Sequence, residues 1–211
     1  MAATPLIHVV DDDEAVRDSL TVLLEAAGFA VRTYGSATGL LGASLGTIGC
    51  VLTDVRMPEM DGLELQRRLR EAGAPLPVIV MTGHGDVPIA VEAMKAGAAD
   101  FLEKPFDDEQ LLASLRRAIA ASERVRDEAE AAADIMTRLA TLTPKEHEVL
   151  DKLVEGLPNK TIAYDLGSSP RTVEVHRARV MEKMGARSLP ELVRMTIAVS
   201  GGSAPIKPSR R

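Results

Sequence analysis

The sequence is poor in aromatic residues and almost free of cysteine. Its 211 residues include no Trp, three Phe, two Tyr and one Cys. A single thiol excludes an internal disulfide and a zinc site built from cysteines. No apolar run approaches the ~20 residues needed to cross a bilayer, and the N-terminus lacks the basic segment and long apolar stretch of a secretory signal. We therefore expect a cytoplasmic protein that makes no membrane contact.

Charge is unevenly distributed along the chain. The formal net charge is −6, and 45% hydrophobic with 27% charged residues is a globular composition. Residues 1–140 carry 13 basic and 23 acidic side chains, whereas residues 141–211 carry 12 basic and 8 acidic ones. An acidic part joined to a basic part indicates two different functions on one chain.

Residues 6–121 alternate short β-branched runs with helical patterns, which predicts a five-stranded, parallel, doubly wound sheet of the flavodoxin/CheY-like kind. Three of the runs are almost entirely apolar, as in strands covered on both faces. In such sheets the functional groups gather at the carboxyl ends of the strands. The predicted strands are 6–10, 29–33, 50–54, 77–82 and 101–104.

The remaining chain has only helical patterns. We predict a receiver-like domain at 1–121, a helical linker at 122–141, a small all-α domain of four helices at 142–200 and a disordered tail at 201–211. Within the all-α domain, a helix at 159–166, a break at Gly167 and a helix at 170–184 form a helix-turn-helix pattern.

Acidic side chains follow two strands that we expect to be neighbours. Asp11 and Asp12 follow the first strand and Asp54 ends the third, so the three carboxylates converge at one edge of the sheet. Such a cluster predicts Mg²⁺, which prefers oxygen ligands. Thr82 and Lys104 end the fourth and fifth strands at the same edge. Together these groups are the parts needed for phosphoryl transfer to an aspartate; Asp13, by contrast, is expected to cap a helix.

Residues 1–121 resemble a bacterial response-regulator receiver domain. The resemblance implies that Asp54 is the phospho-acceptor and that Asp11 and Asp12 hold Mg²⁺ with the backbone carbonyl of Arg56. It also implies that Thr82 and Lys104 contact the phosphoryl group, that Phe101 is the aromatic switch residue, and that a dimer face includes Ile89, Val91 and Lys95. The matching segments are 9–13, 53–62, 81–86 and 97–106.

The basic part contains cations around the second helix of the helix-turn-helix pattern, which would lie in the DNA major groove. Residues 143–199 resemble the LuxR/FixJ-type DNA-binding domain through segments 142–146, 156–163 and 169–177. That resemblance places the base-reading positions at Glu174, Val175 and Ala178, with Thr172 and the cations serving the DNA backbone. The cations are Lys160, Arg171, Arg177, Arg179 and Lys183.

Together the resemblances identify the chain as a member of the FixJ branch of two-component response regulators. They imply a cognate sensor histidine kinase, FixL-like and oxygen-responsive in nitrogen-fixation control, a homodimer when phosphorylated, double-stranded promoter DNA and RNA polymerase as partners, and an activator without enzymatic turnover of outside substrates. One alternative is a protein-interaction module whose helical domain binds a sigma factor. A metal-dependent phosphatase is disfavoured because Arg56 occupies the place of the second acid.

Overall fold

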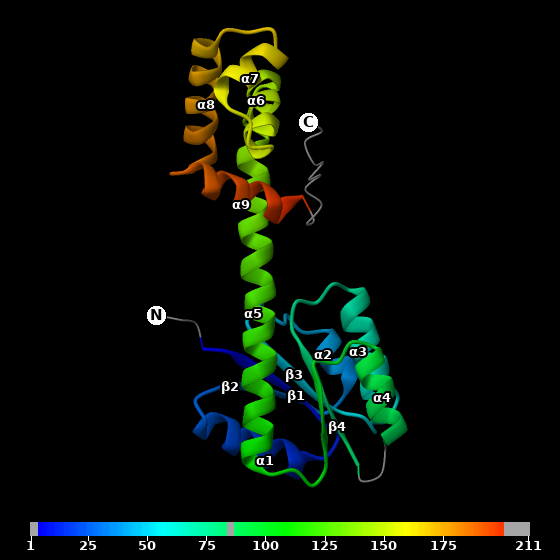
Figure 1. The fold of residues 1–211 in the computed structure, drawn as a ribbon. Coiled ribbons are helices and arrows are strands. Elements are labelled where there is room, and N and C mark those ends of the chain that lie inside the picture. The colour runs from blue at the N-terminus through cyan, green and yellow to red at the C-terminus, as the bar shows by residue number, and fades with distance from the viewer. Residues whose placement is uncertain (1–3, 84–86, 201–211) are drawn as a thin grey trace. The chain divides into compact units, whose positions relative to one another are not determined.

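A computed structural model describes residues 4–83 and 87–200 (Figure 1). Its contacts divide the chain into two compact units, Met1–Val125 and Arg126–Arg211. The predicted disordered tail at 201–211 lies outside the described residues. Within the residues that are described, no helix is both long and apolar enough to cross a membrane.

The first unit is built on a five-stranded parallel sheet with the order β2-β1-β3-β4-β5. The predicted fold class is therefore confirmed. Because β1 lies next to β3, the residues that follow these two strands meet at one edge of the sheet. The strands are β1 (Leu6–Val10), β2 (Ala30–Tyr34), β3 (Gly49–Asp54), β4 (Val78–Thr82) and β5 (Asp100–Glu103).

Helices cover both faces of this sheet (Figure 1). One face packs against α1 (Glu14–Ala26) and the first part of α5 (Asp108–Leu139), in a core that includes residues of both helices. The other face packs against α2 (Ala37–Leu41), α3 (Gly62–Glu71) and α4 (Val87–Lys95). Burial on both sides explains why β1, β3 and β4 are nearly continuous apolar runs.

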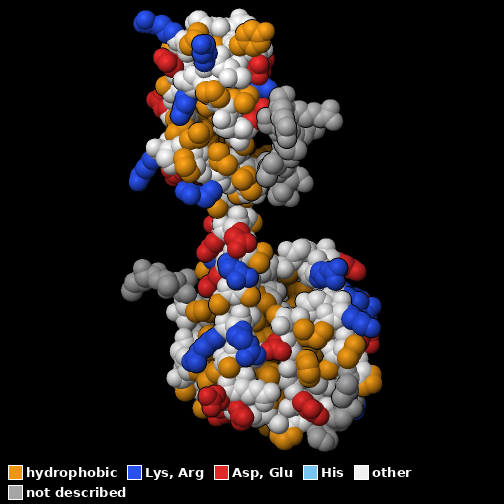
Figure 2. Space-filling view, in the orientation of Figure 1, with side chains coloured by type: hydrophobic (Ala, Val, Ile, Leu, Met, Phe, Trp, Pro, Cys, Tyr) orange, Lys and Arg blue, Asp and Glu red, His pale blue; other side chains and the backbone are white. Residues whose placement is uncertain are grey.

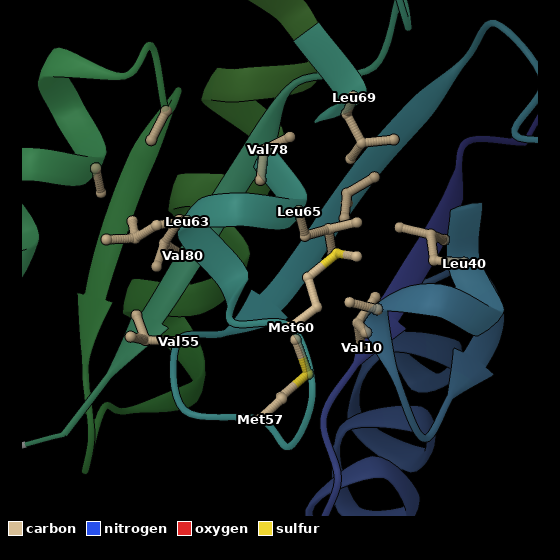
Figure 3. Close-up of a cluster of buried hydrophobic side chains, with 14 of the residues drawn as sticks. Val10, Leu40, Val55, Met57, Met60, Leu63, Leu65, Leu69, Val78 and Val80 are labelled. Atoms are coloured by element: carbon tan, nitrogen blue, oxygen red, sulfur yellow. The ribbon is translucent and has the colours of Figure 1, made fainter. Parts of the chain in front are cut away.

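The loop after β3 is anchored in the second of these cores. Figure 3 shows the Met57 and Met60 side chains from this loop lying among the apolar side chains of the core, and both residues are at most 8% exposed. The loop closes where the amide of Gly62 donates to the carbonyl of Val55 at 2.9 Å. These contacts fix the backbone immediately after Asp54.

The structure shifts some predicted boundaries and adds one helix. β2 begins and ends one residue later than the predicted 29–33, and β5 ends at Glu103, so Lys104 follows the strand instead of ending it. Helix α2 was not predicted, because its five residues make less than two helical turns and show no periodic pattern. Asp13 caps α1 as predicted, accepting from the amide of Ala15 at 2.9 Å.

A buried histidine ties β1 to the sheet's edge. The Nδ1 atom of His8 lies 3.1 Å from the hydroxyl of Tyr34, and its Nε2 atom lies 3.1 Å from the carbonyl oxygen of Leu45. The His8 and Tyr34 rings stack with centroids 5.8 Å apart. These contacts hold β2 and the segment before β3 against β1.

The second unit consists of helices packed on one core. Residues of α6, α7, α8 and α9 form this core, and Ile135 and Leu139 from the end of α5 pack against it. Helix α5 runs without a break through the predicted boundary at 121. The helices are α6 (Pro144–Val154), α7 (Asn159–Asp165), α8 (Pro170–Met184) and α9 (Leu189–Val199).

Candidate functional site

The sheet edge brings two carboxylates to a single ammonium group. The Nζ atom of Lys104 donates to Oδ2 of Asp11 at 2.9 Å and to Oδ1 of Asp54 at 2.5 Å. Asp11 is 2% exposed and the Asp54 side chain 13% exposed. The fold therefore brings these three residues together, although Asp54 lies 43 positions after Asp11 and Lys104 lies 50 positions after Asp54.

The remaining carboxylate oxygens of this site are held by backbone amides. Oδ1 of Asp11 accepts from the amide of Asp13 at 3.0 Å, and Oδ2 of Asp54 accepts from the amide of Arg56 at 2.6 Å. Each carboxylate is thus fixed by one local amide and by the shared ammonium of Lys104. These hydrogen bonds fix the orientation of the two carboxylates at the edge formed by the carboxyl ends of the strands.

The carboxylates keep Lys104 charged. Partial burial by itself lowers the pKa of the Lys104 ammonium, but hydrogen bonds and charge attraction from Asp54 and Asp11 outweigh burial and raise this pKa above its ordinary value. The site therefore keeps a permanent positive charge beside the two acids at neutral pH. A positive charge in this place can neutralise the oxygens of an incoming phosphoryl group.

Thr82 and Phe101 lie on the neighbouring strands β4 and β5, where Phe101 pairs with Val80 and Thr82 with Glu103. Thr82 ends β4 and is 2% exposed, and its backbone carbonyl accepts from the amide of Lys104 at 2.7 Å. Phe101 on β5 is 39% exposed. Both residues line a cavity of about 340 Å³ between β4, β5 and α4. The other residues that line it are Gly83, Ala90, Val91, Met94, Lys95 and Glu103.

The predicted metal ligands are only partly brought together. Asp11 and Asp54 both accept from the Lys104 ammonium, whereas Asp12 is exposed. Among residues 4–83 and 87–200, no group of three or more His, Cys, Asp or Glu side chains is close enough to hold a metal ion. The ligand role of Asp12 and of the Arg56 carbonyl stays a prediction.

Arg17 supports the acidic loop and was not identified from the sequence. Its Nη1 atom donates to the backbone carbonyl of Asp11 at 2.7 Å from α1. The same guanidinium lies under Gly35, where an added Cβ would be 3.6 Å from Nη1. An arginine six residues after an acid has no signature of its own in a helix pattern, so only the folded loop reveals the contact.

Helices α7 and α8 form the predicted helix-turn-helix. The turn between them contains Gly167 in a left-handed conformation with φ 58°, and the amide of Ser168 donates to the carbonyl of Ala163 at 2.8 Å. Helix α8 begins at Pro170, where Ser169 accepts from the amide of Thr172 at 3.1 Å. The sequence prediction of this helix was correct at both ends.

Helix α8 has one buried and one exposed face. Val173, Val180 and Met184 are buried in the core of the second unit. The predicted base-reading residues Glu174, Val175 and Ala178 are all exposed, and their spacing places them on one side of the helix. The exposed face is therefore free of core contacts over the positions that the resemblance assigns to DNA bases.

The predicted DNA-contacting cations differ in their surroundings. Lys160, Arg171 and Arg179 are exposed, and Thr172 is exposed at the start of α8. Figure 2 shows blue Lys and Arg side chains along the side of this unit where α8 lies. Arg177 is half-buried and donates to Oδ1 of Asn159 on α7 at 3.1 Å.

Lys183 departs most from its predicted role as a phosphate contact. Its Nζ atom donates to Oε2 of Glu146 at 2.6 Å and to the backbone carbonyl of Thr141 at 3.0 Å. The ammonium already has two partners within the unit, although the Lys183 side chain is 33% exposed, and its role as a phosphate contact stays a prediction. Sequence spacing could not reveal a partner 37 residues away.

Two protein families match the chain. A family model described as "Response regulator receiver domain" matches residues 7–116, and one described as "Bacterial regulatory proteins, luxR family" matches residues 140–196. The first match contains Asp11, Asp54 and Lys104, and the second contains α6, α7 and α8. The acidic site and the helix-turn-helix therefore lie in the two domains where the sequence analysis placed them.

Similar proteins cover nearly the whole chain. "Transcriptional regulatory protein FixJ" of Azorhizobium caulinodans is 56% identical over 94% of both chains. FixJ of Rhizobium meliloti is 53% identical over 94% of this chain and 97% of its own. The C4-dicarboxylate transport regulatory protein DctR of Rhodobacter capsulatus is 48% identical over 90% of this chain and 98% of its own.

Solved structures agree with these relatives. The response regulator StyR superposes with a TM-score of 0.81 at 40% identity, covering 92% of this chain and 98% of its own. Full-length FixJ from B. japonicum gives a TM-score of 0.59 at 48% identity over 95% and 99%. The chain belongs to the FixJ-type two-component response regulators, which are transcriptional regulators with a receiver and a luxR-family DNA-binding domain and are not catalytic enzymes.

Proposed function

We propose that this response regulator is a cytoplasmic transcriptional activator that a sensor histidine kinase switches on by phosphorylating Asp54. The likeness to FixJ proteins over most of the chain supports a FixL-like kinase partner and a role in oxygen-responsive nitrogen-fixation control. The single observation that carries the proposal is the ammonium of Lys104 shared by Asp11 and Asp54.

The chemistry needs little from the protein beyond placement and charge. An oxygen of Asp54 forms the new bond to phosphorus while the bond between phosphorus and the donor nitrogen or oxygen breaks, and the donor group leaves with its electron pair. The Lys104 ammonium then neutralises a phosphoryl oxygen in place of the carboxylate. The hydroxyl of Thr82, at the end of the neighbouring strand, donates to another phosphoryl oxygen.

The donor set of this edge fits Mg²⁺. Two carboxylates that both lie within 2.9 Å of one ammonium nitrogen are close enough to share a small divalent cation. Asp12 follows Asp11 directly and reaches solvent at the same edge, where its oxygens would complete the set with the Arg56 carbonyl. When bound, Mg²⁺ would supply positive charge to the phosphoryl oxygens.

The cavity beside Thr82 gives Phe101 a place to move. When Thr82 turns toward a phosphoryl group, the ring of Phe101 enters the apolar cavity lined by Val91 and Met94, and the surface formed by α4 and β5 changes shape. Val91 and Lys95 are exposed on this surface, and Ile89 packs at its inner edge. We propose that two phosphorylated copies pair through this surface.

The pair then binds DNA. Two copies of α8 would enter successive major grooves of a two-fold promoter site, with Glu174, Val175 and Ala178 toward the bases and the exposed cations toward phosphates. The bound dimer would recruit RNA polymerase. The Glu174 carboxylate can accept from cytosine N4, and Val175 can contact a thymine methyl.

Labelling with acetyl phosphate in the presence of Mg²⁺ tests this proposal. Asp54→Asn should abolish labelling, because the amide is a poor nucleophile. The matched control Asp18→Asn, which changes an exposed carboxylate on α1, should label at the wild-type rate. Labelling of Asp54→Asn at that rate would place the acceptor elsewhere.

The DNA-binding half of the proposal is tested by salt. Affinity of the phosphorylated full chain for promoter DNA should fall steeply as salt rises, because counterions are released from each contacted phosphate. If the helical domain binds a sigma factor instead, the chain should show no such salt-dependent affinity for promoter DNA.

A further inference from the structure

The C-terminal end of α8 is tied to the segment that joins α5 and α6. Lys183 donates to Oε2 of Glu146, and the same oxygen accepts from the amide of Thr143 at 2.8 Å. Lys183 also donates to the carbonyl of Thr141. Glu146 is 2% exposed, so one buried carboxylate joins the start of α6 to the last turn of α8.

The Lys183 ammonium keeps this carboxylate ionised. The hydrogen bond from Lys183 is the largest influence, and with the bonds at Thr143 it lowers the pKa of Glu146 to about 2. The ion pair therefore persists through the whole neutral and mildly acidic range. The charge of Lys183 is therefore already neutralised by Glu146 in the absence of DNA.

A second cation closes the same end of the helix. Nη1 of Arg138, in the last turn of α5, donates to the carbonyl of Met184 at 2.8 Å, and Nη2 pairs with Asp134 at 2.8 Å. Carbonyls at a helix C-terminus have no partner within the helix. Gly185 caps α8 with φ 66°, and a Cβ added there would lie 2.5 Å from Nη1 of Arg138. The guanidinium thus fills the space beneath the cap.

These contacts determine which way α8 faces. Successive residues of a helix are about 100° apart around its axis, since 3.6 residues make one turn. A small rotation or tilt of α8 would therefore move Glu174, Val175 and Ala178 off the base edges. The buried residues Val173, Val180 and Met184 set the rotation only through apolar packing, which tolerates small shifts more readily than directed hydrogen bonds do.

We propose that Lys183 and Arg138 are positioning residues for DNA recognition, which fix the C-terminal end of α8 on the α5–α6 junction and do not contact DNA phosphate. This inference rests on the proposed binding of DNA by α8. It separates the cations of the second unit into two groups. Lys160, Arg171 and Arg179 are exposed and available to phosphate, whereas Lys183 and Arg138 act through the orientation of the helix.

The test compares Lys183→Gln with Lys160→Gln in the phosphorylated full chain. Two duplexes of equal length serve as probes: the site that the wild type selects from randomised DNA, and an unrelated sequence. Lys160→Gln should reduce the salt slope by about 1 and leave the affinity ratio between the duplexes unchanged. Lys183→Gln should leave the salt slope unchanged and reduce the ratio at least about fivefold, comparable to one mismatched base pair.

Conservative variants separate positioning from stability. Lys183→Arg should keep the wild-type affinity ratio between the two duplexes, because its guanidinium can reach both Glu146 and the Thr141 carbonyl. Arg138→Gln should reduce the ratio without changing the salt slope, and it tests the proposal even if Lys183→Gln does not fold. All measurements are made well below each variant's unfolding transition.

Two results would overturn the proposal. A salt slope reduced by about 1 in Lys183→Gln, with the ratio intact, would show that Lys183 contacts phosphate. An unchanged slope and ratio, with only a lower unfolding temperature, would show a purely structural ion pair. If the wild type itself bound both duplexes equally and without salt dependence, the proposed DNA binding would fail instead.

Discussion

His8 is a buried residue whose two ring nitrogens both have partners in the neutral form. Nε2–H donates to the Leu45 carbonyl, and Nδ1 accepts from the Tyr34 hydroxyl. Burial lowers the pKa of His8, the hydrogen bond to Leu45 opposes this, and the charge of Arg32 lowers it further. The fold therefore favours neutral His8, and its contribution to stability is present above the ordinary pKa of 6.5 and lost as the pH falls below it.

We expect His8→Gln to reduce the pH dependence of receiver stability. As the pH falls below the ordinary histidine pKa of 6.5, the wild type should lose free energy of unfolding, because the unfolded chain binds a proton at His8 that the folded chain resists. The amide of Gln can still donate to Leu45 but does not titrate. Urea unfolding at several pH values measures the slope, with His147→Gln in the second unit as control; equal slopes in wild type and His8→Gln would contradict this reading.

For single residues, the sequence predicts the charged side chains of the site better than it predicts the side chains that hold loops and helix ends in place. Asp11, Asp54 and Lys104 could be predicted to meet, because the ends of parallel strands define one edge and charged side chains at that edge are conspicuous. The contact of Arg17 with the Asp11 carbonyl could not be predicted, and neither could the pairing of Lys183 with Glu146. Both depend on how loops and helix ends approach each other, which no short sequence period encodes.

Among the elements, the loop between β3 and α3 is tightly constrained. Gly62 starts α3 directly against the strand end, where an added Cβ would lie 2.2 Å from the carbonyl oxygen of Asp54. Met57 and Met60 hold the loop from the core side. The backbone at Asp54, the proposed phospho-acceptor, is thus enclosed on both sides.

Gly62→Ala should therefore slow phosphorylation and destabilise the receiver by about 1–3 kcal/mol, the usual cost of overpacking. The backbone of Asp54 must move to admit the methyl group. Gly73→Ala is the matched control, because Gly73 has φ 67° but no atom near an added Cβ; it should cost about 1 kcal/mol through backbone strain alone and leave the labelling rate unchanged. Equal labelling rates in the two variants would refute the coupling between Gly62 and Asp54.

Element prediction succeeded where burial dictates the pattern. Strands covered on both faces are continuous apolar runs, and α8 is bounded by Ser169-Pro170 at its start and Gly185 at its end, which are strong local signals. The five residues of α2 supply less than two helical turns, too few for a period to appear. The helical segment predicted at 122–141 is also found, as the continuation of α5 to Leu139.

For the molecule as a whole, helix α5 bears on where the DNA-binding unit begins. Ile135 and Leu139 of α5 pack against the core of the second unit, and Arg138 contacts α8. We therefore propose that this unit begins before residue 135, and not at the predicted residue 142. The surface of α4 and β5, with Val91 47% and Met94 44% exposed, belongs to the receiver alone.

We expect Val91→Glu to block dimer formation by the phosphorylated chain, because two added carboxylates would face each other across the proposed interface. Sedimentation with acetyl phosphate should show monomers, and DNA affinity should fall while labelling of Asp54 continues. Val22→Glu is the control, since Val22 is 70% exposed on α1. Dimers that persist in Val91→Glu would place the interface on another surface.

The exposure of the two tyrosines gives the molecule a pair of natural optical reporters. The chain has no tryptophan to dominate its ultraviolet emission, and its only tyrosines are Tyr34 and Tyr164. Tyr34 lies in the receiver beside His8, which can quench its fluorescence, whereas Tyr164 on α7 is 87% exposed. Tyr164→Phe leaves an emission signal from the receiver alone and Tyr34→Phe leaves one from the DNA-binding unit, so the unfolding of each unit can be followed in the intact chain without an attached dye.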